Sequence, residues 1–195
     1  PQKAYSAGLF HGEHVGMAAD YLRLAISEVA NLSERRLYRL LTAPLSADLP
    51  TSLAPSGPGL GLMGLQTTAA ALVSECKSLG WTATLDSIPT CEDQEDHVAM
   101  STTAARRAAE VVALVTHVIN IELVAASRAL KCRLEEDPNL QLGQGTGAAF
   151  AILADARTHL AVPAEAIEMV PKTHKLLLET VLEACPDLHG MGEDR

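Results

Sequence analysis

The stretch AAEVVALVTHVINIELVAASRAL, residues 108–130, decides the fold of this chain. Placed on a helix, it is apolar around nearly its whole circumference, so a single neighbouring helix cannot cover it. The helical pattern around it extends from Glu95 to Lys131, which corresponds to about 55 Å of helix. We therefore expect this segment to lie in the middle of a helical bundle, and at that length in a bundle shared between subunits.

Shorter helices are predicted on both sides of this segment. Apolar residues recur at helical spacing from Val15 to Val29, with Asp20 and Arg23 on the opposite side, which predicts an amphipathic helix. Ser33 is a good N-cap for a second short helix that ends before Pro44. Further helices are expected over residues 63–80, 146–160 and 164–185, the last kinked at Pro171.

The connecting segments complete the predicted organisation. Residues 42–64 contain four prolines and four glycines and are expected to form a long loop. Residues 190–195 are expected to form a flexible tail. We predict one all-α domain over residues 1–195, an elongated helical bundle with long central helices.

Composition excludes several classes of protein. The chain has 195 residues, with 24 acidic and 15 basic side chains and a net charge of −9, so it would repel nucleic-acid phosphates. Only 3% of the residues are aromatic while 48% are hydrophobic, a composition typical of tightly packed helices rich in alanine. The four cysteines form no C-x-x-C pair, which favours the reducing cytoplasm. The uninterrupted apolar runs are too short to span a bilayer, so we expect no membrane.

Two segments are dense in polar residues, residues 8–14 and residues 87–97. The second places four carboxylates within five positions, Glu92, Asp93, Glu95 and Asp96. One interpretation is that they cap the long helix and complement its dipole. The other is that one of them is turned inward beside its neighbours and serves as a general acid or base. Composition alone does not choose between these interpretations.

The first polar segment contains His11, Glu13 and His14, residue types that bind zinc. Their spacing matches no closed zinc site, and no second pair of ligands is evident. We therefore predict no metal, and expect His11 to act as an orienting hydrogen-bond partner.

Several short motifs occur in a distinctive order. They are FHGE at residues 10–13, MGLQ at 63–66 leading into AAALVSE at 69–75, DSIPT at 86–90, and QEDHVAM at 94–100. Together they resemble the C-terminal part of the aromatic amino-acid lyase family, and within it the histidine ammonia-lyase branch. The resemblance covers residues 8–130 most clearly.

The resemblance implies a mostly helical subunit whose long helices form the core of a tetrameric assembly. It also implies elimination of ammonia from a small amino acid by an electrophilic methylidene-imidazolone (MIO) group, which the family makes from an Ala-Ser-Gly triplet. That triplet is absent from these 195 residues. We therefore expect a naturally split enzyme, with Pro1 left by methionine removal. A separate, larger N-terminal lyase-like chain would supply MIO in a hetero-oligomer, and this chain would be inactive alone.

The same resemblance assigns candidate roles to individual residues. Glu95 resembles the carboxylate that contacts substrate and assists proton transfer, with Gln94 beside it. Phe10 resembles the ring near the prosthetic group, and Met63 the residue lining the side-chain pocket. His11 would orient the loop.

Some positions depart from the family pattern. Leu9 replaces the usual Asn, His14 replaces a common Pro, and residues 91–93 replace a small neutral Ser-Ala-Asn with a thiol and two carboxylates. These changes favour an unusual amino acid as substrate. Two alternatives stay open: a 2,3-aminomutase subunit using the same chemistry, and a non-catalytic scaffold or regulator derived from a lyase.

Overall fold

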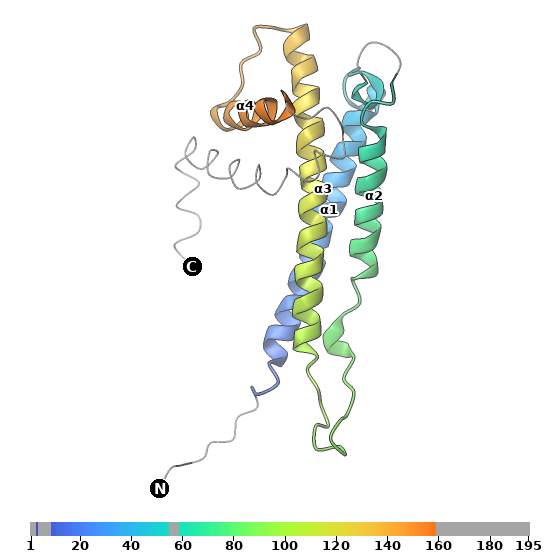
Figure 1. The fold of residues 1–195 in the computed structure, drawn as a ribbon, viewed down its shortest axis with the longest axis vertical. Coiled ribbons are helices and arrows are strands. Elements are labelled where there is room, and N and C mark those ends of the chain that lie inside the picture. The colour runs from blue at the N-terminus through green and yellow to red at the C-terminus, as the bar shows by residue number, and fades with distance from the viewer. Residues whose placement is uncertain (1–2, 4–8, 55–58, 159–195) are drawn as a thin grey trace. The chain divides into compact units, whose positions relative to one another are not determined.

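The computed structural model describes residue 3, residues 9–54 and residues 59–158. Within these ranges the chain forms four α-helices, α1 (Glu13–Leu41), α2 (Met63–Ser78), α3 (Ser101–Glu136) and α4 (Gln144–Thr158) (Figure 1). The described residues contain no strand, only an isolated antiparallel bridge between Thr90 and Glu95. This architecture confirms the predicted all-α class.

Three single-turn 3₁₀ helices lie in the connections. Two of them, η1 (Ala43–Leu45) and η2 (Thr51–Leu53), belong to the proline-rich segment before α2, and η3 (Ala83–Leu85) follows α2. Gly61 in the same segment has a φ of +57° and approaches the backbone of Ser52 and Ala54 so closely that a Cβ would clash. The described residues between α1 and α2 are therefore an ordered connection without an α-helix, as their composition indicates.

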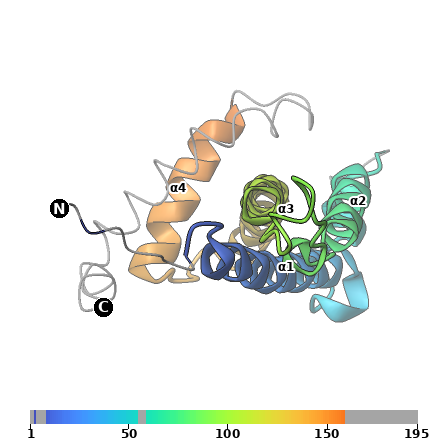
Figure 2. The same cartoon turned by 90° about the horizontal axis from the view of Figure 1, so that it is seen from below.

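The chain divides into two compact units, which are described separately. Unit 1 comprises residues 1–32 and 71–116, and unit 2 comprises residues 33–70 and 117–195. In unit 1, segments of α1, α2 and α3 lie side by side (Figures 1 and 2). Its buried apolar residues are mostly small: Ala30, Val73, Cys76, Ala83, Ala99, Ala104, Ala108, Val111 and Val115. Such residues allow helices to approach closely, which accounts for a core without aromatic rings.

Unit 2 has a more leucine-rich core. Its buried apolar residues are Leu37, Leu41, Leu49, Leu53, Leu62, Leu65, Ala69, Val118, Ile121, Ala125 and Ala129. Arg133 of α3 donates hydrogen bonds to the carbonyl oxygens of Ser46 and Ala47, which anchors the segment after η1 to the helix. Glu122 pairs with Arg36 within the same unit.

The prediction of two helices over residues 15–44 is wrong, because α1 is continuous from Glu13 to Leu41. Ser33 caps nothing: it is fully buried, and its Oγ donates a hydrogen bond to Oε2 of Glu122 at 2.6 Å. A serine whose hydroxyl finds a tertiary partner has no need to terminate a helix. Pro44 lies instead at the start of η1.

The predicted start of the long helix at Glu95 is also wrong, since α3 begins at Ser101. Cys91, Glu92 and Asp93 all have positive φ, and so does Met100 immediately before the helix. Left-handed residues break the helical ladder. The acidic segment therefore lies outside the first turn of α3, and the interpretation that it caps this helix is wrong.

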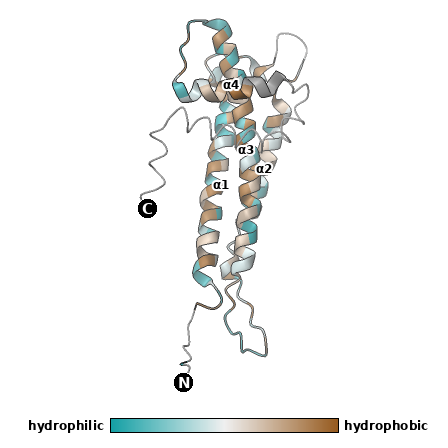
Figure 3. Ribbon diagram, turned by 60° about the vertical axis from the view of Figure 1, so that its left-hand side comes forward, coloured by the Kyte–Doolittle hydropathy of each residue, from teal (hydrophilic) through white to brown (hydrophobic). Residues whose placement is uncertain are grey.

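The polar side of the amphipathic helix α1 is the side that packs inward. The buried positions include Gly16, Asp20, Arg23 and Ala30 at helical spacing, whereas Val15 is 65% exposed. The large apolar residues exposed on the unit 1 part of α1 are Val15, Met17, Tyr21, Leu22, Leu24, Val29 and Leu32. Figure 3 shows brown, hydrophobic stretches along α1. The apolar side of α1 therefore lies on the surface of the single chain.

No membrane span is expected from the sequence, because its uninterrupted apolar runs are short. By length and average composition, however, α3 is apolar enough to cross a membrane. The buried core helix of a soluble protein passes the same test, and α3 supplies core residues to both units. The predicted helix over residues 146–160 corresponds to α4. The predicted helix over 164–185 and the tail over 190–195 lie outside the described residues.

Candidate active site

Two distant polar motifs meet in unit 1. The N-terminal motif at the start of α1 and the QEDHVAM motif before α3 are joined by a close contact, in which Nε2 of His11 lies 2.6 Å from Oε2 of Glu95. Both side chains are about one-third exposed, at 35% and 33%. The pair therefore lies at the surface of the described part of the chain.

A second contact of the same kind lies beside the first. Nε2 of His97 lies 3.3 Å from Oε2 of Glu13, the first residue of α1. In addition, Oγ of Ser101, the first residue of α3, donates a hydrogen bond to the carbonyl oxygen of His11 at 2.9 Å. Two contacts thus join the two motifs directly, and a third joins the N-terminal motif to the start of α3.

The acidic motif is carried on a closed loop, residues 84–101, which we call the site loop. Thr90 and Glu95 exchange two backbone hydrogen bonds, at 3.1 and 3.2 Å. These bonds bring the two arms of the loop together on either side of its tip, residues 91–94. Closer to its base, the backbone N–H of Val98 donates to Oγ of Ser87 at 2.9 Å. The loop is therefore an ordered hairpin-like structure, and the position of Glu95 depends on both of its arms.

Glu95 differs from the other carboxylates of the acidic segment. Glu92, Asp93 and Asp96 are exposed, whereas Glu95 is partly buried and paired with His11. Of the four, only Glu95 has an environment that fixes the direction of its carboxylate. Glu95 is therefore the one carboxylate of the acidic segment that contacts the N-terminal motif within the described residues.

The remaining candidate residues lie in different surroundings. The ring of Phe10 is 86% exposed and contacts the His11 ring edge-on, with centroids 5.2 Å apart. Gln94 is exposed on the site loop, next to Glu95. Met63 belongs to unit 2, where it is the first residue of α2 and 46% exposed. The structure thus brings His11, Phe10 and Glu95 together within one unit.

A buried polar cluster, which the sequence motifs did not indicate, lies at the base of the site loop. Asp20 pairs with Arg23 at 2.6 Å and accepts hydrogen bonds from both the backbone N–H and the hydroxyl of Thr84. Burial alone would raise the pKa of Asp20, but the hydrogen bonds from Thr84 and Ala83 and the charge of Arg23 outweigh it and lower the pKa. The only sequence signal was a pair of opposite charges three positions apart on α1.

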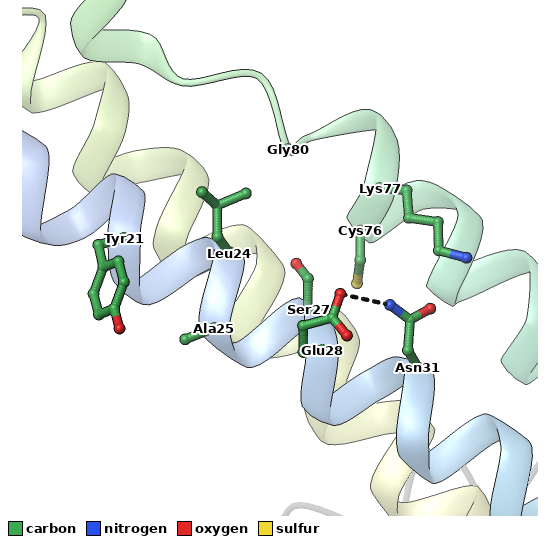
Figure 4. Close-up of a pocket in the computed structure, with 9 residues that line it drawn as sticks. All are labelled: Tyr21, Leu24, Ala25, Ser27, Glu28, Asn31, Cys76, Lys77 and Gly80. Atoms are coloured by element: carbon green, nitrogen blue, oxygen red, sulfur yellow. Dashed lines mark hydrogen bonds between the residues drawn. The ribbon is translucent and has the colours of Figure 1, made fainter.

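A groove of about 590 Å³ lies between α1 and α2 in unit 1 (Figure 4). The residues that line it are Tyr21, Leu24, Ala25, Ser27, Glu28, Asn31, Cys76, Lys77 and Gly80. None of the candidate site residues is among them. The described residues also contain no group of three or more His, Cys, Asp or Glu side chains that could hold a metal ion.

These motifs and this helical architecture define a class of enzyme. The model of the family described as "Aromatic amino acid lyase" matches residues 1–155, and the chain belongs to that family. It is 48% identical over 152 residues to the histidine ammonia-lyase of Caldanaerobacter subterraneus subsp. tengcongensis, covering 77% of this chain and 29% of the relative.

Solved structures show the same relationship. The histidine ammonia-lyase of Trypanosoma cruzi has 34% identity and a TM-score of 0.79, covering 94% of this chain and 35% of that one. Tyrosine aminomutase from Streptomyces globisporus has 28% identity and a TM-score of 0.81, covering 95% of this chain and 35% of that one. The chain therefore spans about a third of the length of these relatives.

Proposed function

We propose that this chain is the small subunit of a split ammonia-lyase and that it completes the active site of a larger, N-terminal lyase-like chain. The observation that carries the proposal is the pair formed by His11 and Glu95, which joins two family motifs at an accessible surface. The similarity to histidine ammonia-lyases supports histidine or a related amino acid as the substrate.

The chemistry of the available residues bears on the MIO group. No Ala-Ser-Gly occurs in the sequence, since Ala126 and Ser127 are followed by Arg128. Under this proposal, the electrophile would be formed in the larger chain. When present, the MIO group would supply the electrophile that takes the substrate amine. The exposed ring of Phe10 and the partly exposed carboxylate of Glu95 suit the wall of a pocket shared with that chain.

The proposed roles follow from the geometry of unit 1. Glu95 would contact the substrate and assist proton transfer, because its carboxylate is both accessible and fixed in direction. His11 would orient that carboxylate. Phe10 would pack against the substrate side, and Gln94 would add a polar contact from the site loop. Met63 is proposed to line the side-chain pocket from the start of α2.

Exposed apolar surface supports assembly with other polypeptides. On α1, Leu22 is 50% exposed and Leu32 is 60% exposed, and on α3 Val112 is 46% exposed. Apolar rows of this kind are usually covered by a partner. We propose a hetero-oligomer built around a tetrameric helical core. The cytoplasm is its proposed setting, where thiols such as Cys76 and Cys91 remain reduced.

A 2,3-aminomutase is the second candidate. It is favoured by the structural similarity to tyrosine aminomutase and by the altered tip of the site loop at residues 91–93. Both reactions would use Glu95 in the same position. They differ in whether the product is an olefin with free ammonia or a β-amino acid.

Co-expression tests the proposal. This chain is produced together with an Ala-Ser-Gly-bearing lyase chain from the same source, and the purified complex is incubated with single amino acids. We expect a stable complex that releases ammonia, while neither chain does so alone. A β-amino acid product without net ammonia would identify the aminomutase. Failure of the two chains to associate would overturn the split-enzyme proposal.

Two substitutions separate an enzyme subunit from a scaffold. Glu95→Gln removes the proton-transfer group and Phe10→Ala removes the exposed ring, and neither residue is part of a buried core. We expect both to lower turnover while the complex stays assembled. Leu140→Ala is a matched control on an exposed apolar residue, because Leu140 lies outside the site loop and outside the apolar surface proposed to bind a partner. Unchanged turnover in all three variants would favour the scaffold.

A further inference from the structure

A buried ion pair on α1 lies against the base of the site loop. Asp20 is 2% exposed and Arg23 is fully buried, with Nη2 of Arg23 2.6 Å from Oδ1 of Asp20. The same Nη2 donates a hydrogen bond to the carbonyl oxygen of Trp81 at 2.7 Å. From α3, Nη1 of Arg107 also donates to that carbonyl, at 3.3 Å. The chain is thus held just before the loop by two helices.

The second oxygen of Asp20 holds the first residue of the loop itself. Oδ2 accepts two hydrogen bonds from Thr84, one from the backbone N–H and one from Oγ1, each 2.9 Å long. Gly16, one turn earlier on α1, leaves room for this contact, because a Cβ there would lie 2.8 Å from Cγ2 of Thr84. Asp20 is therefore connected to both Arg23 and the site loop, with one oxygen for each.

The cost of this arrangement indicates that stability is not its main purpose. Within the part of the chain that the structure describes, Nε and Nη1 of Arg23 have no hydrogen-bond partner although both are buried. Each such unmade hydrogen bond lowers the stability of the folded chain. A buried ion pair often gives no more stability than apolar residues of the same size. What the pair does provide is a fixed direction for the Asp20 carboxylate.

We propose that Asp20, oriented by Arg23, is a positioning residue that sets where the site loop places Glu95 relative to His11. The connection runs from Thr84 through the cross-loop hydrogen bonds of Ser87 with Val98 and of Thr90 with Glu95. The inference rests on the proposed function where it concerns turnover. Its structural part, the coupling of Asp20 to the His11–Glu95 pair, stands independently.

The structural part is tested on the chain alone, with isotope-labelled histidine and NMR of the imidazole signals. Thr84→Val removes one hydrogen bond to Asp20, Thr84→Ser retains it, and Asp20→Asn weakens the ion pair. We expect the His11 and His97 signals to shift in Thr84→Val and Asp20→Asn, and to keep their wild-type positions in Thr84→Ser.

Glu122→Gln in unit 2 is the control for a general loss of stability, because it disturbs a less buried arginine–carboxylate pair that lies within the other unit. We expect it to lower the melting temperature without moving the His11 signals. Folded Thr84→Val with His11 signals identical to the wild type would overturn the proposal. Should Asp20→Asn fail to fold, the comparison of Thr84→Val with Thr84→Ser still decides it.

In the assembled enzyme, Asp20→Asn is expected to reduce kcat by up to about 100-fold with a smaller change in KM, as for a displaced catalytic group. If the wild-type complex shows no turnover, the proposed function fails while the NMR comparison still tests the coupling. If the wild type turns over and Asp20→Asn matches it in kcat, the positioning role fails and the proposed function stands.

Discussion

Replacing Gly16 by alanine tests the close approach on which unit 1 is built. A Cβ at this position would lie 2.8 Å from Cγ2 of Thr84, and 3.1 and 3.2 Å from Cα and Cβ of Ser101. Neither neighbour can move freely. Thr84 is held by two hydrogen bonds from its own N–H and hydroxyl to Asp20, and Ser101 begins α3. The added methyl group therefore forces α1 away from the loop base.

The magnitude follows from two opposing contributions. Alanine is favoured over glycine inside a helix by about 1 kcal/mol. Overpacking by one methyl group costs about 1–3 kcal/mol. Gly64 provides the matched control, because it lies in the first turn of α2 and has nothing within 4 Å of its would-be Cβ. Gly64→Ala should therefore gain helix propensity without a clash, and we expect the two variants to differ by about 1–3 kcal/mol.

The assay is thermal and urea unfolding followed by circular dichroism. For a chain of this size each kcal/mol corresponds to about 2–4 °C in Tm. Gly16→Ala is expected to melt below the wild type, and Gly64→Ala at or above it. If Gly16→Ala were as stable as Gly64→Ala, the close packing of α1 against Thr84 and Ser101 would be wrong.

Three further predictions concern individual side chains. The pKa of Asp20 is lowered in the folded chain, so ionised Asp20 stabilises the fold above its unfolded-state pKa, and this stabilisation is lost on acidification. In Asp20→Asn, Tm measured as the pH falls below about 4 should therefore decrease less than in the wild type. Burial raises the pKa of the Cys76 thiol while Cys91 is exposed, so a thiol reagent should modify Cys91 in the native chain and Cys76 only after unfolding, as mass spectrometry of digests would show. Glu122→Ala should lower the free energy of unfolding by about 1–3 kcal/mol, because buried Ser33 loses its acceptor, whereas Arg36→Ala should cost less since Arg36 is 57% exposed; urea titrations compare the two.

The helical class and the central segment could be predicted because they depend on local periodicity. Residues 108–130 are apolar on nearly all faces, and that pattern is typical of a helix that is covered on most of its sides. Helix ends were less predictable, because they are decided by tertiary partners. Ser33 has the residue type of a cap, yet its hydroxyl binds Glu122 from a distant part of the chain.

The inward packing of the polar side of α1 has a related cause. Periodicity separates Leu22 from Asp20 but does not say which side packs inward. Here the inward side contains Gly16, Asp20 and Arg23, because a small residue and a satisfied carboxylate permit close contact with the loop base. A hydrophobic pattern is usually taken to place its apolar side in the core, and this does not hold for α1, where apolar residues face outward.

For the candidate site, the sequence indicated the N-terminal motif and the QEDHVAM motif, but not the contact between them. His11 and Glu95 are each recognisable within a motif, whereas the 2.6 Å contact between them depends on the fold. The left-handed residues at 91–93 could not be foreseen, because none of them is glycine. The supporting pair of Asp20 and Arg23 carries no motif and emerges only from burial and hydrogen bonding.

The two sets of hydrogen bonds across the site loop determine how the chain would respond to limited proteolysis. Cys91, Glu92 and Asp93 form an exposed tip, while the arms on either side are joined by the bonds of Thr90 with Glu95 and of Ser87 with Val98. A cleavage within the tip would leave two fragments that remain associated through α1, α2 and α3. The nicked protein would migrate as one species in native gels and as two in denaturing gels, with its histidine–glutamate contact preserved.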